Sequence, residues 1–559
     1  MVYAKMGHMK ASDLFVHCLK NEGVEYVFGV PGEENLDLLK SLESSSVEFI
    51  SVRHEQAAAF MADAYGRLTG KAGVCLSTLG PGATNLCTGI ADAFLDRAPV
   101  VAITAQADRS RMHKESHQFI PIHEHFASIT KWGATITTTS AIPEIVRKAF
   151  KVAEMHKPGP THIEFPEDIA EKEIADPELK PLQVSEKIPM RVRRTWLRKA
   201  RELIAAAKNP LIFVGNGVIR DQASESVRAF AELTHIPVIN TFMAKGVMTS
   251  GHHLQIGTLG LQARDYVQCA VERADLIIAI GYDLVEYSPM NWNPHRDKKI
   301  LHIDTTPAEI DGFYPVELEL VGDLKVLLEA FAKLLKQEKV RGEDHLNIQT
   351  AMKKEIEDYK DDLGFPVKPQ KILWDIRQIL GPEDILVSDV GAHKMWVARV
   401  YPAYSPNTVL ISNGLAAMGF ALPSAIAAKL IFPEKKVCAV VGDSGFMMNI
   451  QELETAVRLN TPMVIVIFND RSHGLIEWKA QIKFKEHFDY GMKNKSPDFV
   501  KLAESFGGAG ILIKKTDELF PALEKAFKMN TVVVIDVPVD YSENMKLTQK
   551  LKNLSCPIT

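Results

Sequence analysis

Two acidic side chains, each following a run of apolar residues, are the strongest chemical signal in the sequence. Asp443 follows the apolar run 437–441, and Asp470 follows the apolar run 463–468. The residues between the two runs have helical spacing, which predicts a strand–helix–strand unit. Because such a unit places its strands side by side and parallel, both aspartates should lie at the carboxyl ends of neighbouring strands. We therefore expect the two carboxylates to meet at one edge of a sheet.

Paired oxygen ligands of this kind suit a hard octahedral cation such as Mg²⁺, which takes the rest of its shell from water or a phosphate. Gly442 and Gly445 lie close to Asp443 and allow the backbone to approach a phosphate, and the start of a helix favours an anion. Taken alone, Asp443 is more simply interpreted as a helix cap. Its pairing with Asp470 favours a site for a metal ion and a diphosphate.

The Gly-Asp-Ser-Gly motif at 442–445, followed by a helix, a strand and Asp470, resembles the signature of thiamine-diphosphate-dependent enzymes. The resemblance implies that Asp443, the side chain of Asp470 and the backbone carbonyl of Ser472 hold Mg²⁺ against the diphosphate. Family members usually have glycine at the position of Ser444 and asparagine at the position of Asp470. The additional negative charge is compatible with a divalent cation.

The same resemblance assigns further cofactor contacts. The backbone carbonyl of Ala416 should accept a hydrogen bond from the 4′-amino group of the aminopyrimidine, and Met418 should hold thiamine in its bent conformation. A methionine here could instead be an ordinary core residue. The other residues expected at the cofactor are Gly391, Ala392, His393, Gly442, Asp443, Ser444, Gly445, Asp470, His473 and Gly474.

A second candidate for chemistry, Glu55, lies between a predicted strand (49–52) and an apolar helix (57–68). A carboxylate in apolar surroundings acquires a raised pKa and can stay protonated to donate a hydrogen bond. A solvated loop glutamate is the alternative. The surrounding block RHEQAAAFMADAYGRLTGK resembles the thiamine-enzyme block in which this glutamate hydrogen-bonds N1′ of the aminopyrimidine and promotes proton removal from C2.

Four histidines lie around Gln118, namely His113, His117, His123 and His125. No cysteine and no HExxH spacing accompanies them, so the sequence gives a zinc site little support. The resemblance to acetolactate synthases implies instead that Gln118 faces the substrate and that His117 assists it. Earlier in the chain, Gly80-Pro81-Gly82 lacks the GxGxxG spacing and is either a tight turn or a cofactor contact.

Short apolar runs alternate with helical segments along the chain, which is typical of α/β domains with parallel sheets. We expect three doubly wound domains, at 1–175, 190–340 and 365–559, joined by a proline-containing linker and a charged helical connector. The resemblance identifies them as a pyrimidine-binding domain, a central Rossmann-like domain and a diphosphate-binding domain.

The length of 559 residues also fits three domains of ordinary size. A net charge of −5 gives no basic footprint, so nucleic acid is not an expected partner. No apolar run is long enough to span a membrane, and the N-terminus lacks a signal-peptide core. The six scattered cysteines without a CxxC motif suggest reduced thiols and a cytoplasmic protein.

Within the thiamine-dependent group, the chain is most similar to the FAD-free catabolic acetolactate synthases. The segment 282–287 lacks the arginine–phenylalanine–aspartate run usual in FAD-binding relatives, so FAD is not expected. The implied reaction decarboxylates pyruvate and ligates the remaining two-carbon unit to a second 2-oxo acid, giving 2-acetolactate. The implied assembly is a homodimer or homotetramer, in which Glu55 of one subunit completes a site on the diphosphate-binding domain of another.

One departure from the family pattern concerns the substrate. Catabolic acetolactate synthases carry a lysine after the motif at 28–32, whereas this chain has Glu33-Glu34, which would repel a pyruvate carboxylate. A non-ligating 2-oxo acid decarboxylase or another thiamine-dependent carboligase is therefore an alternative. A non-catalytic homologue is disfavoured because Glu55, Asp443 and Asp470 are all retained.

Overall fold

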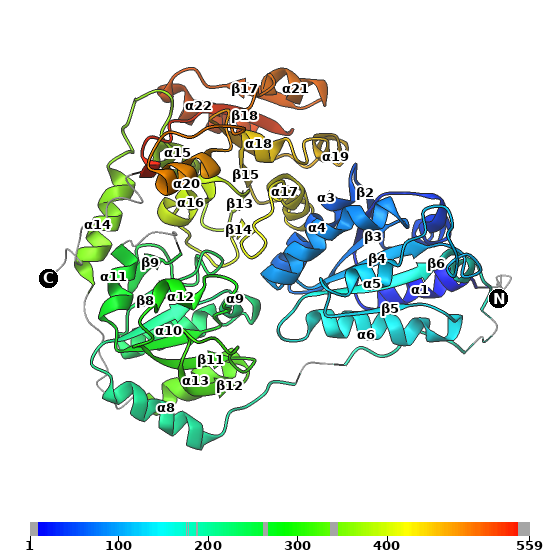
Figure 1. Ribbon diagram of the computed structural model, residues 1–559, viewed down its shortest axis with the longest axis horizontal. Helices are drawn as coiled ribbons and strands as arrows, with labels where there is room; N and C mark the ends of the chain where they lie inside the picture. Colours follow the sequence, from blue (N-terminus) through cyan, green and yellow to red (C-terminus); the bar gives the residue numbers. More distant parts are fainter. Residues whose placement is uncertain are drawn as a thin grey trace. The chain divides into compact units, whose positions relative to one another are not determined.

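The computed structural model describes residues 9–174, 176, 178–185, 188–260, 266–335 and 345–545. Its strands form three six-stranded sheets whose neighbouring strands are all parallel. Figure 1 shows helices interleaved with the strands along the chain. This confirms the expected α/β fold class with doubly wound parallel sheets. The contacts divide the chain into two units, of which the first contains one sheet together with residues 414–431 and 449–459, and the second contains the other two sheets.

The first unit has the sheet order β2-β1-β3-β4-β6-β5. Its strands are β1 (Tyr26–Gly29), β2 (Glu48–Ser51), β3 (Gly73–Ser77), β4 (Val100–Gln106), β5 (Trp132–Thr135) and β6 (Pro160–Pro166). Its helices are α1 (Ala11–Asn21), α2 (Leu36–Glu43), α3 (Glu55–Thr69), α4 (Pro81–Asp96), α5 (Ile122–Phe126), α6 (Ile142–Glu154), α7 (Glu167–Ala170), α17 (Ala421–Ile431) and α19 (Glu452–Arg458), with 3₁₀ turns η1 (Glu33–Asn35) and η2 (Thr139–Ala141).

Helices cover both faces of this sheet. The apolar sides of α1, α2 and α6 pack with inward-facing strand residues into one core. Helix α3 packs against α4 and α17, and it can do so closely because its first turns are rich in alanine. Phe60 of α3 meets Phe420, just before α17, edge to face at 5.6 Å. The start of α3, where Glu55 lies, is thus held from several sides.

The middle sheet has the order β12-β11-β10-β7-β8-β9, the strand order of a Rossmann fold. Its strands are β7 (Pro210–Val214), β8 (Val238–Asn240), β9 (Gln255–Thr258), β10 (Leu276–Ile280), β11 (Lys299–Asp304) and β12 (Val316–Val321). Its helices are α8 (Arg194–Ala206), α9 (Gly217–Arg220), α10 (Ser224–Thr234), α11 (Tyr266–Arg273), α12 (Pro289–Trp292) and α13 (Leu324–Leu335). Separate apolar clusters fill its two faces.

The expected charged connector contains the helix α14 (Leu346–Glu357), which is followed by a turn, and residues 336–344 lie outside the described residues. The third sheet has the order β14-β13-β15-β16-β18-β17. Its strands are β13 (Ile385–Ser388), β14 (Val409–Ile411), β15 (Val437–Gly442), β16 (Val464–Asn469), β17 (Ala509–Leu512) and β18 (Val533–Pro538). Its helices are α15 (Pro369–Ile379), α16 (Ala392–Val400), α18 (Asp443–Phe446), α20 (Gly474–Phe484), α21 (Phe499–Ser505) and α22 (Leu519–Lys528), with the 3₁₀ turn η3 (Thr516–Glu518).

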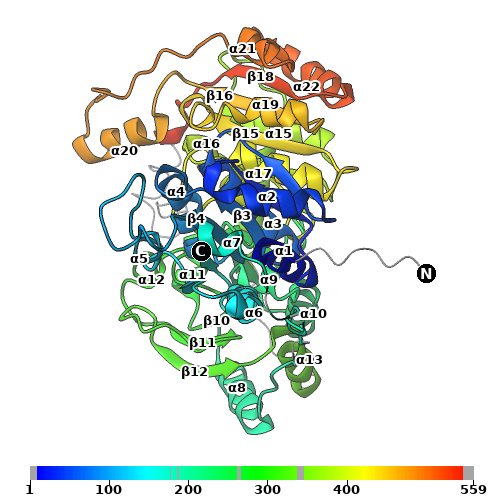
Figure 2. The same ribbon diagram turned by 90° about the vertical axis from the view of Figure 1, so that its right-hand side faces the viewer.

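The first and third sheets share one strand order, since both run 2-1-3-4-6-5 when their strands are numbered in sequence. In this order the second strand lies on one side of the first strand, and the third strand lies on the other side. The switch points lie between β1 and β3 and between β13 and β15, where open α/β sheets bind ligands at the carboxyl ends of the strands. Figure 2 shows β15, β16 and β18 side by side in the third sheet. Their residues are almost wholly buried, which stabilises the sheet by about 2 kcal/mol for each valine or isoleucine side chain.

No helix in the described part of the chain combines the length and apolar character needed to cross a membrane. Cys18, Cys75, Cys87 and Cys438 are free thiols, as expected. Cys269 is disulfide-bonded, so the expectation of reduced thiols is wrong for this residue. The remaining cysteine, Cys556, lies outside the described residues.

Candidate active site

Asp443 and Asp470 lie together at one edge of the third sheet. Strands β15 and β16 pair in parallel with Gly442 opposite Phe468, so Asp443 and Asp470 both follow directly on the carboxyl ends of these strands. Each carboxyl group influences the pKa of the other, so the two groups are close neighbours. The predicted strand–helix–strand unit and the meeting of the two carboxylates are therefore confirmed.

The electrostatics of this pair favour a cation. Asp443 is only 2% exposed, and burial raises its pKa. Burial, and then the charge of Asp443, raise the pKa of Asp470 to about 7. Two hydrogen bonds partly compensate the charges, from Ser496 Oγ to Asp443 Oδ2 at 2.9 Å and from the Ser472 N–H to Asp470 Oδ1 at 3.2 Å. A divalent cation between the carboxylates would remove the remaining repulsion.

Ser472 lies beside this pair, with its side chain turned elsewhere. Its hydroxyl donates to Glu477 Oε2 at 2.8 Å and to the Met492 carbonyl at 3.2 Å. The backbone carbonyl of Ser472 as a metal ligand stays a prediction. The next residues, His473 and Gly474, lead into α20, and a β-carbon on Gly474 would lie 2.1 Å from Asp470 Oδ2.

The other side of this site is built from the segment after β13. Gly391 and Ala392 begin α16, and a β-carbon on Gly391 would lie 2.8 Å from Cε1 of His393. The imidazole of His393 is buried, and burial lowers its pKa to about 3, so it is neutral at pH 7. Within the described residues, Nε2 of His393 has no hydrogen-bond partner. A buried polar atom of this kind, at a topological switch point, fits a ligand with polar groups.

Two residues of this site gave no sequence signal. Asn494 donates from Nδ2 to Ser444 Oγ at 2.6 Å, and Ser496 donates to Asp443 as described above. Both lie in a polar loop after α20, where no apolar run precedes them to mark a strand end. Gly445 was predicted, and a β-carbon there would lie 3.1 Å from an Asp389 carboxylate oxygen, so glycine allows the close approach.

In the first unit, Glu55 is the first residue of α3 and is 8% exposed, so the solvated-loop interpretation is wrong. His54 caps this helix, since its Nδ1 accepts a hydrogen bond from the Gln56 N–H at 3.1 Å. Asn85 Nδ2 donates to Glu55 Oε2 at 2.9 Å and thereby fixes the carboxyl group. Asn85 lies on α4 and was not predicted as a site residue.

The turn Gly80–Gly82 connects Glu55 with Gln118. A β-carbon on Gly82 would lie 3.2 Å from Glu55 Oε1, and one on Gly80 would lie 2.7 Å from the Gln118 carbonyl. Gly80 has φ +52°, which favours glycine. Gln118 is exposed, with φ +58°. His117 is also exposed, and only its place next to Gln118 in the chain links it to this edge.

The predicted pyrimidine contacts, Ala416 and Met418, lie in the segment that packs with the first unit. Ala416 is exposed and has φ +57°, a strained conformation for a residue with a side chain. Met418 is half-buried rather than fully enclosed by apolar core. The segment is anchored at both ends, by the Gly414 N–H donating to Asp96 Oδ1 at 2.5 Å and by Asn449 Nδ2 donating to the Gly419 carbonyl at 2.8 Å.

The histidines around Gln118 do not form a metal site. His123 stacks against His162 at 6.2 Å, whereas His113 and His125 are exposed. Among the described residues, no three His, Cys, Asp or Glu side chains are arranged to hold a metal ion. The pair Asp443 and Asp470 therefore leaves the rest of a metal's shell to carbonyl, water and ligand oxygens.

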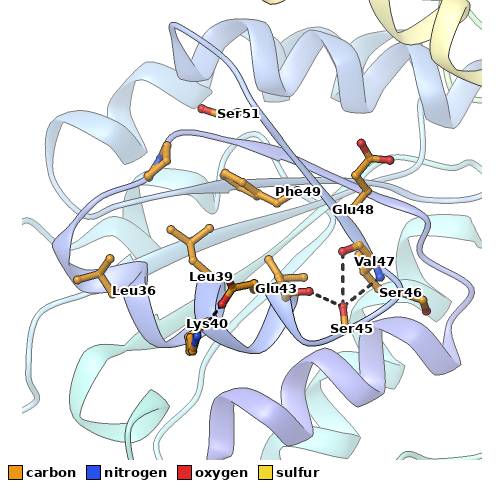
Figure 3. A pocket seen from close by; sticks show the side chains of 12 residues that line it. Leu36, Leu39, Lys40, Glu43, Ser45, Ser46, Val47, Glu48, Phe49 and Ser51 are labelled. Atoms are coloured by element: carbon orange, nitrogen blue, oxygen red, sulfur yellow. Dashed lines mark hydrogen bonds and ion pairs between the residues drawn. The ribbon is translucent and has the colours of Figure 1, made fainter. Parts of the chain in front are cut away.

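A separate cavity of about 730 Å³ lies between α2 and β2 (Figure 3). Its wall is mainly apolar, and two of the charged groups at its rim, Lys40 and Glu43, form an ion pair with each other. The hydrogen bonds drawn for Ser45 Oγ in Figure 3 go to backbone groups of residues close to it in the chain. None of the predicted site residues lines this cavity.

The same regions match models of known protein families. Residues 9–126 match the N-terminal TPP binding domain of thiamine pyrophosphate enzymes, residues 197–331 match the central domain, and residues 389–537 match the C-terminal TPP binding domain. The N-terminal match contains Glu55, and the C-terminal match contains Asp443 and Asp470.

Curated relatives are similar over nearly the whole chain. A probable acetolactate synthase large subunit from Methanocaldococcus jannaschii is 36% identical, over 98% of this chain and 96% of the relative. The acetolactate synthase of Bacillus subtilis is 34% identical, over 96% and 94% of the two chains. The acetolactate synthase large subunit of Haemophilus influenzae is 34% identical, over 97% and 96%. With all three domain models matched in order, the chain belongs to the acetolactate synthase family of thiamine-diphosphate-dependent enzymes.

Proposed function

We propose that this protein is an acetolactate synthase that uses thiamine diphosphate and Mg²⁺ to join two 2-oxo acids, with pyruvate as the donor. The observation that carries the proposal is the meeting of Asp443 and Asp470 at the carboxyl ends of β15 and β16, in a chain that also presents a buried Glu55. The full-length similarity to acetolactate synthases supports the reaction class.

The metal and the diphosphate are assigned to the third sheet. Asp443, Asp470 and the Ser472 carbonyl would hold Mg²⁺, and the buried like charges of the two aspartates provide the driving force. The diphosphate would lie against the glycine-containing turns after β13 and β15, beside the unpartnered Nε2 of His393. These turns would exclude water from the diphosphate and fix its orientation.

Glu55 is assigned to the aminopyrimidine. Asn85 fixes one of its carboxyl oxygens at 2.9 Å, so the other oxygen is the one available to hold or pass a proton at N1′. Bound thiamine diphosphate supplies the nucleophile and the electron sink for decarboxylation and carbon–carbon bond formation. Gln118, across the Gly80–Gly82 turn, would contact the substrate, and His117 would assist it.

The assembly that this mechanism requires is a homodimer or homotetramer. Glu55 belongs to the first unit and the metal site to the second, and we propose that each active site combines these groups from two subunits. We assign the domains to 1–175, 190–340 and 365–559. A cytoplasmic location also belongs to this proposal and is supported by the buried free thiols of Cys18, Cys75 and Cys438.

We further propose that the middle domain holds no FAD. Its switch point lies between β7 and β10, where a dinucleotide phosphate would approach a glycine-containing turn. The Glu286 carboxylate occupies this position, accepting the Asn216 N–H at 3.0 Å and the Thr241 hydroxyl at 2.5 Å. A β-carbon on Gly215 would lie 2.9 Å from Glu286 Oε1. A phosphate could bind here only by displacing this carboxylate.

One observation favours a second candidate function, a decarboxylase without ligation or a carboligase for another acceptor. Gly32 packs against Thr78, the residue that also contacts Gly82 beside Glu55, so the turn before Glu33 lies at the same edge of the sheet. Glu33 is exposed there. A negative charge at this edge disfavours an anionic acceptor.

The test is a product assay. The purified protein is incubated with pyruvate, thiamine diphosphate and Mg²⁺, and acetolactate and acetaldehyde are both measured. Acetolactate as the main product supports the proposal. Acetaldehyde as the only product would show that the protein is a decarboxylase rather than a synthase. The absence of both products with pyruvate, and of the corresponding products with longer 2-oxo acids, would reject the reaction class.

The role of Glu55 has its own test. Glu55→Gln keeps the shape of the side chain and its contact with Asn85 but cannot exchange a proton at N1′. We expect thiamine diphosphate to bind within about threefold of the wild-type affinity, while hydrogen–deuterium exchange at C2 of the bound cofactor slows at least 100-fold, within the range typical of general acid–base catalysis. Exchange at the wild-type rate would remove Glu55 from the mechanism.

A further inference from the structure

A buried glutamate on α19, Glu452, is hydrogen-bonded to the backbone immediately before Glu55. Its side chain has no exposed surface. Oε1 accepts the N–H groups of Arg53 and His54, both at 3.1 Å, and Oε2 accepts the Arg53 N–H at 3.2 Å. All of these residues belong to the first unit. The carboxylate therefore binds the two peptide groups that connect β2 to the helix carrying Glu55.

Among the described residues, these two N–H groups have no partner in the bonding patterns of β2 and α3. The N–H of Val52 still bonds to the Gly29 carbonyl across β1 and β2, and the helical bonds of α3 begin with Ala57 donating to the His54 carbonyl. Arg53 and His54 fall between the two patterns. Glu452 is the acceptor that satisfies these two donors, so its loss would remove the hydrogen bonds that fix this turn.

Glu452 is itself held in place. The Thr455 hydroxyl donates to its Oε2 at 2.6 Å. Burial raises the pKa of Glu452, and the hydrogen bonds from Thr455, Arg53 and His54 lower it again, because every donor around the carboxylate favours its ionised form. The carboxyl group thus accepts hydrogen bonds from the turn before Glu55 and from Thr455 of its own helix.

A neighbouring glutamate offers a matched comparison. Glu454 lies two residues further along α19 and also contacts Arg53, but through the side chain, with Glu454 Oε2 2.8 Å from Arg53 Nε. The side chain of Arg53 is 55% exposed, so this ion pair lies at the surface. Surface pairs of this kind have small effects, and this one does not touch the backbone before Glu55.

We propose that Glu452 is a positioning residue for the reaction, which sets the start of α3 so that the Glu55 carboxyl group meets the aminopyrimidine. The inference rests on the proposed function and extends it to a residue that makes no contact with cofactor or substrate. It acts through two peptide groups rather than through a side chain, and its effect should therefore appear in proton transfer rather than in cofactor affinity.

The test uses Glu452→Gln in the full-length protein loaded with thiamine diphosphate and Mg²⁺. Glutamine keeps the size of the side chain but replaces one accepting oxygen by an NH₂ group, which cannot accept the Arg53 and Thr455 donors. We expect C2 exchange of the bound cofactor to slow at least 10-fold, with the affinity for thiamine diphosphate changed less than threefold. The control Glu454→Gln should leave both quantities within twofold of wild type.

A double variant separates positioning from a general loss of structure. If Glu452 acts only through Glu55, then Glu452→Gln added to Glu55→Gln should slow C2 exchange by less than twofold beyond the single Glu55 variant. A multiplicative effect of the two substitutions, or an equal fall of exchange rate and cofactor affinity in Glu452→Gln, would overturn the inference.

A milder variant covers the case in which Glu452→Gln does not fold. Thr455→Val removes the hydroxyl that orients Oε2, and we expect a two- to fivefold slower exchange with unchanged cofactor affinity. Wild-type exchange in both Thr455→Val and any folded Glu452 variant rejects the inference, whereas wild-type exchange in Glu55→Gln rejects the proposed function itself.

Discussion

The backbone of Gly474 lies so close to the Asp470 carboxylate that no side chain fits at position 474. A β-carbon on Gly474 would lie 2.1 Å from Asp470 Oδ2, far inside the contact distance of real atoms. Gly474 is the first residue of α20, so the start of this helix is packed directly on the carboxylate. The orientation of Asp470, a proposed metal ligand, therefore depends on Gly474, which is not itself a proposed ligand.

Gly474→Ala should weaken the metal site. The added methyl group must displace the Asp470 carboxylate or the start of α20, because there is no free volume between them. We expect the Mg²⁺ concentration needed for half-maximal binding of thiamine diphosphate to rise about 10- to 100-fold, as for other residues that orient metal ligands. The measurement is a fluorescence titration of thiamine diphosphate at a series of Mg²⁺ concentrations.

The matched control is Gly312→Ala in the middle domain. A β-carbon on Gly312 would meet no atom within 4 Å, and its backbone conformation is open to other residues. This variant should keep the wild-type Mg²⁺ requirement. An unchanged requirement in Gly474→Ala as well would show that Asp470 is not oriented by this contact, or that it is no metal ligand.

The two aspartates should respond differently to substitution. Asp470→Asn retains an oxygen ligand and removes the charge that burial and Asp443 make unfavourable. We expect the thermal midpoint of the metal-free protein to rise, and Mg²⁺-dependent cofactor binding to stay within about tenfold. Asp443→Ala removes the ligand altogether and should abolish Mg²⁺-dependent binding. Thermal scans in chelator, with and without added Mg²⁺ and cofactor, measure both effects.

An Asp470→Asn protein that is less stable than wild type in chelator would contradict the account of repulsion between the carboxylates. If cofactor binding by Asp443→Ala still depended on Mg²⁺, Asp443 at the end of β15 would not be a metal ligand.

Several parts of the fold and site were predictable because they depend on local pattern. The run 437–441 predicted β15 and the run 463–468 predicted β16, since buried parallel strands have continuous apolar sequences. The parallel crossover then placed Asp443 and Asp470 together, because crossover connections follow a fixed geometry. The apolar run 57–68 predicted the helix α3, and the structure buries Glu55 at the start of this helix.

Other parts depend on tertiary contacts that have no local signal. Asn85, Asn494 and Ser496 reach the site from a helix face and a polar loop. Glu452 reads in the sequence as an ordinary residue of an amphipathic helix, and only the packing of α19 brings it to Arg53. Hydrogen bonds between segments some 400 positions apart cannot be inferred from spacing within either segment.

The buried His162 should make the protein less stable in acid. Burial lowers its pKa to about 3, with a smaller contribution from His123, and its Nε2 lies 2.8 Å from the Thr104 hydroxyl. In the unfolded chain the imidazole takes up a proton near pH 6.5, whereas the folded protein keeps it neutral. Its contribution to stability is therefore complete above about pH 6.5 and is lost as the pH falls toward 3, at up to about 1.4 kcal/mol per pH unit.

His162→Phe isolates this contribution. Phenylalanine can keep the stacking on Phe126, where the ring centroids are 4.4 Å apart, but it loses the bond to Thr104. We expect a lower thermal midpoint than wild type at pH 7 and a difference that shrinks as the pH falls from 7 to 5. The control His113→Gln, at an exposed position, should follow the wild type. A difference that is independent of pH would contradict a neutral, buried His162.

Glu286 should decide whether the middle domain accepts an anion. Burial raises its pKa to about 7, and its carboxylate fills the turn after β7. Glu286→Ala should expose the N–H of Asn216 and the hydroxyl of Thr241, and the variant should bind pyrophosphate or ADP at least tenfold more tightly than wild type. Isothermal titration of wild type, Glu286→Ala and the exposed control Glu317→Ala measures this difference.

The wild-type protein should also be purified without the visible absorbance of a flavin. Flavin bound to wild type at one molecule per chain, or equal anion affinity in wild type and Glu286→Ala, would reject the assignment of Glu286 to this position.

The charge of Glu33 should control the affinity for 2-oxo acids. Glu33 is exposed at the start of η1, and the preceding Gly32 packs on Thr78 beside the Glu55 site. Removing one negative charge from a partly screened edge changes the interaction with an anion by about 1 kcal/mol. Glu33→Gln should thus lower the KM for pyruvate about two- to fivefold and Glu33→Lys further, with kcat changed less than KM. The exposed Glu48→Gln on β2 is the control and should keep the wild-type KM. The effect should become smaller in 0.5 M salt, because charges separated by more than a Debye length are then screened. A KM for pyruvate that does not respond to the charge at position 33 would show that the substrate carboxylate binds elsewhere.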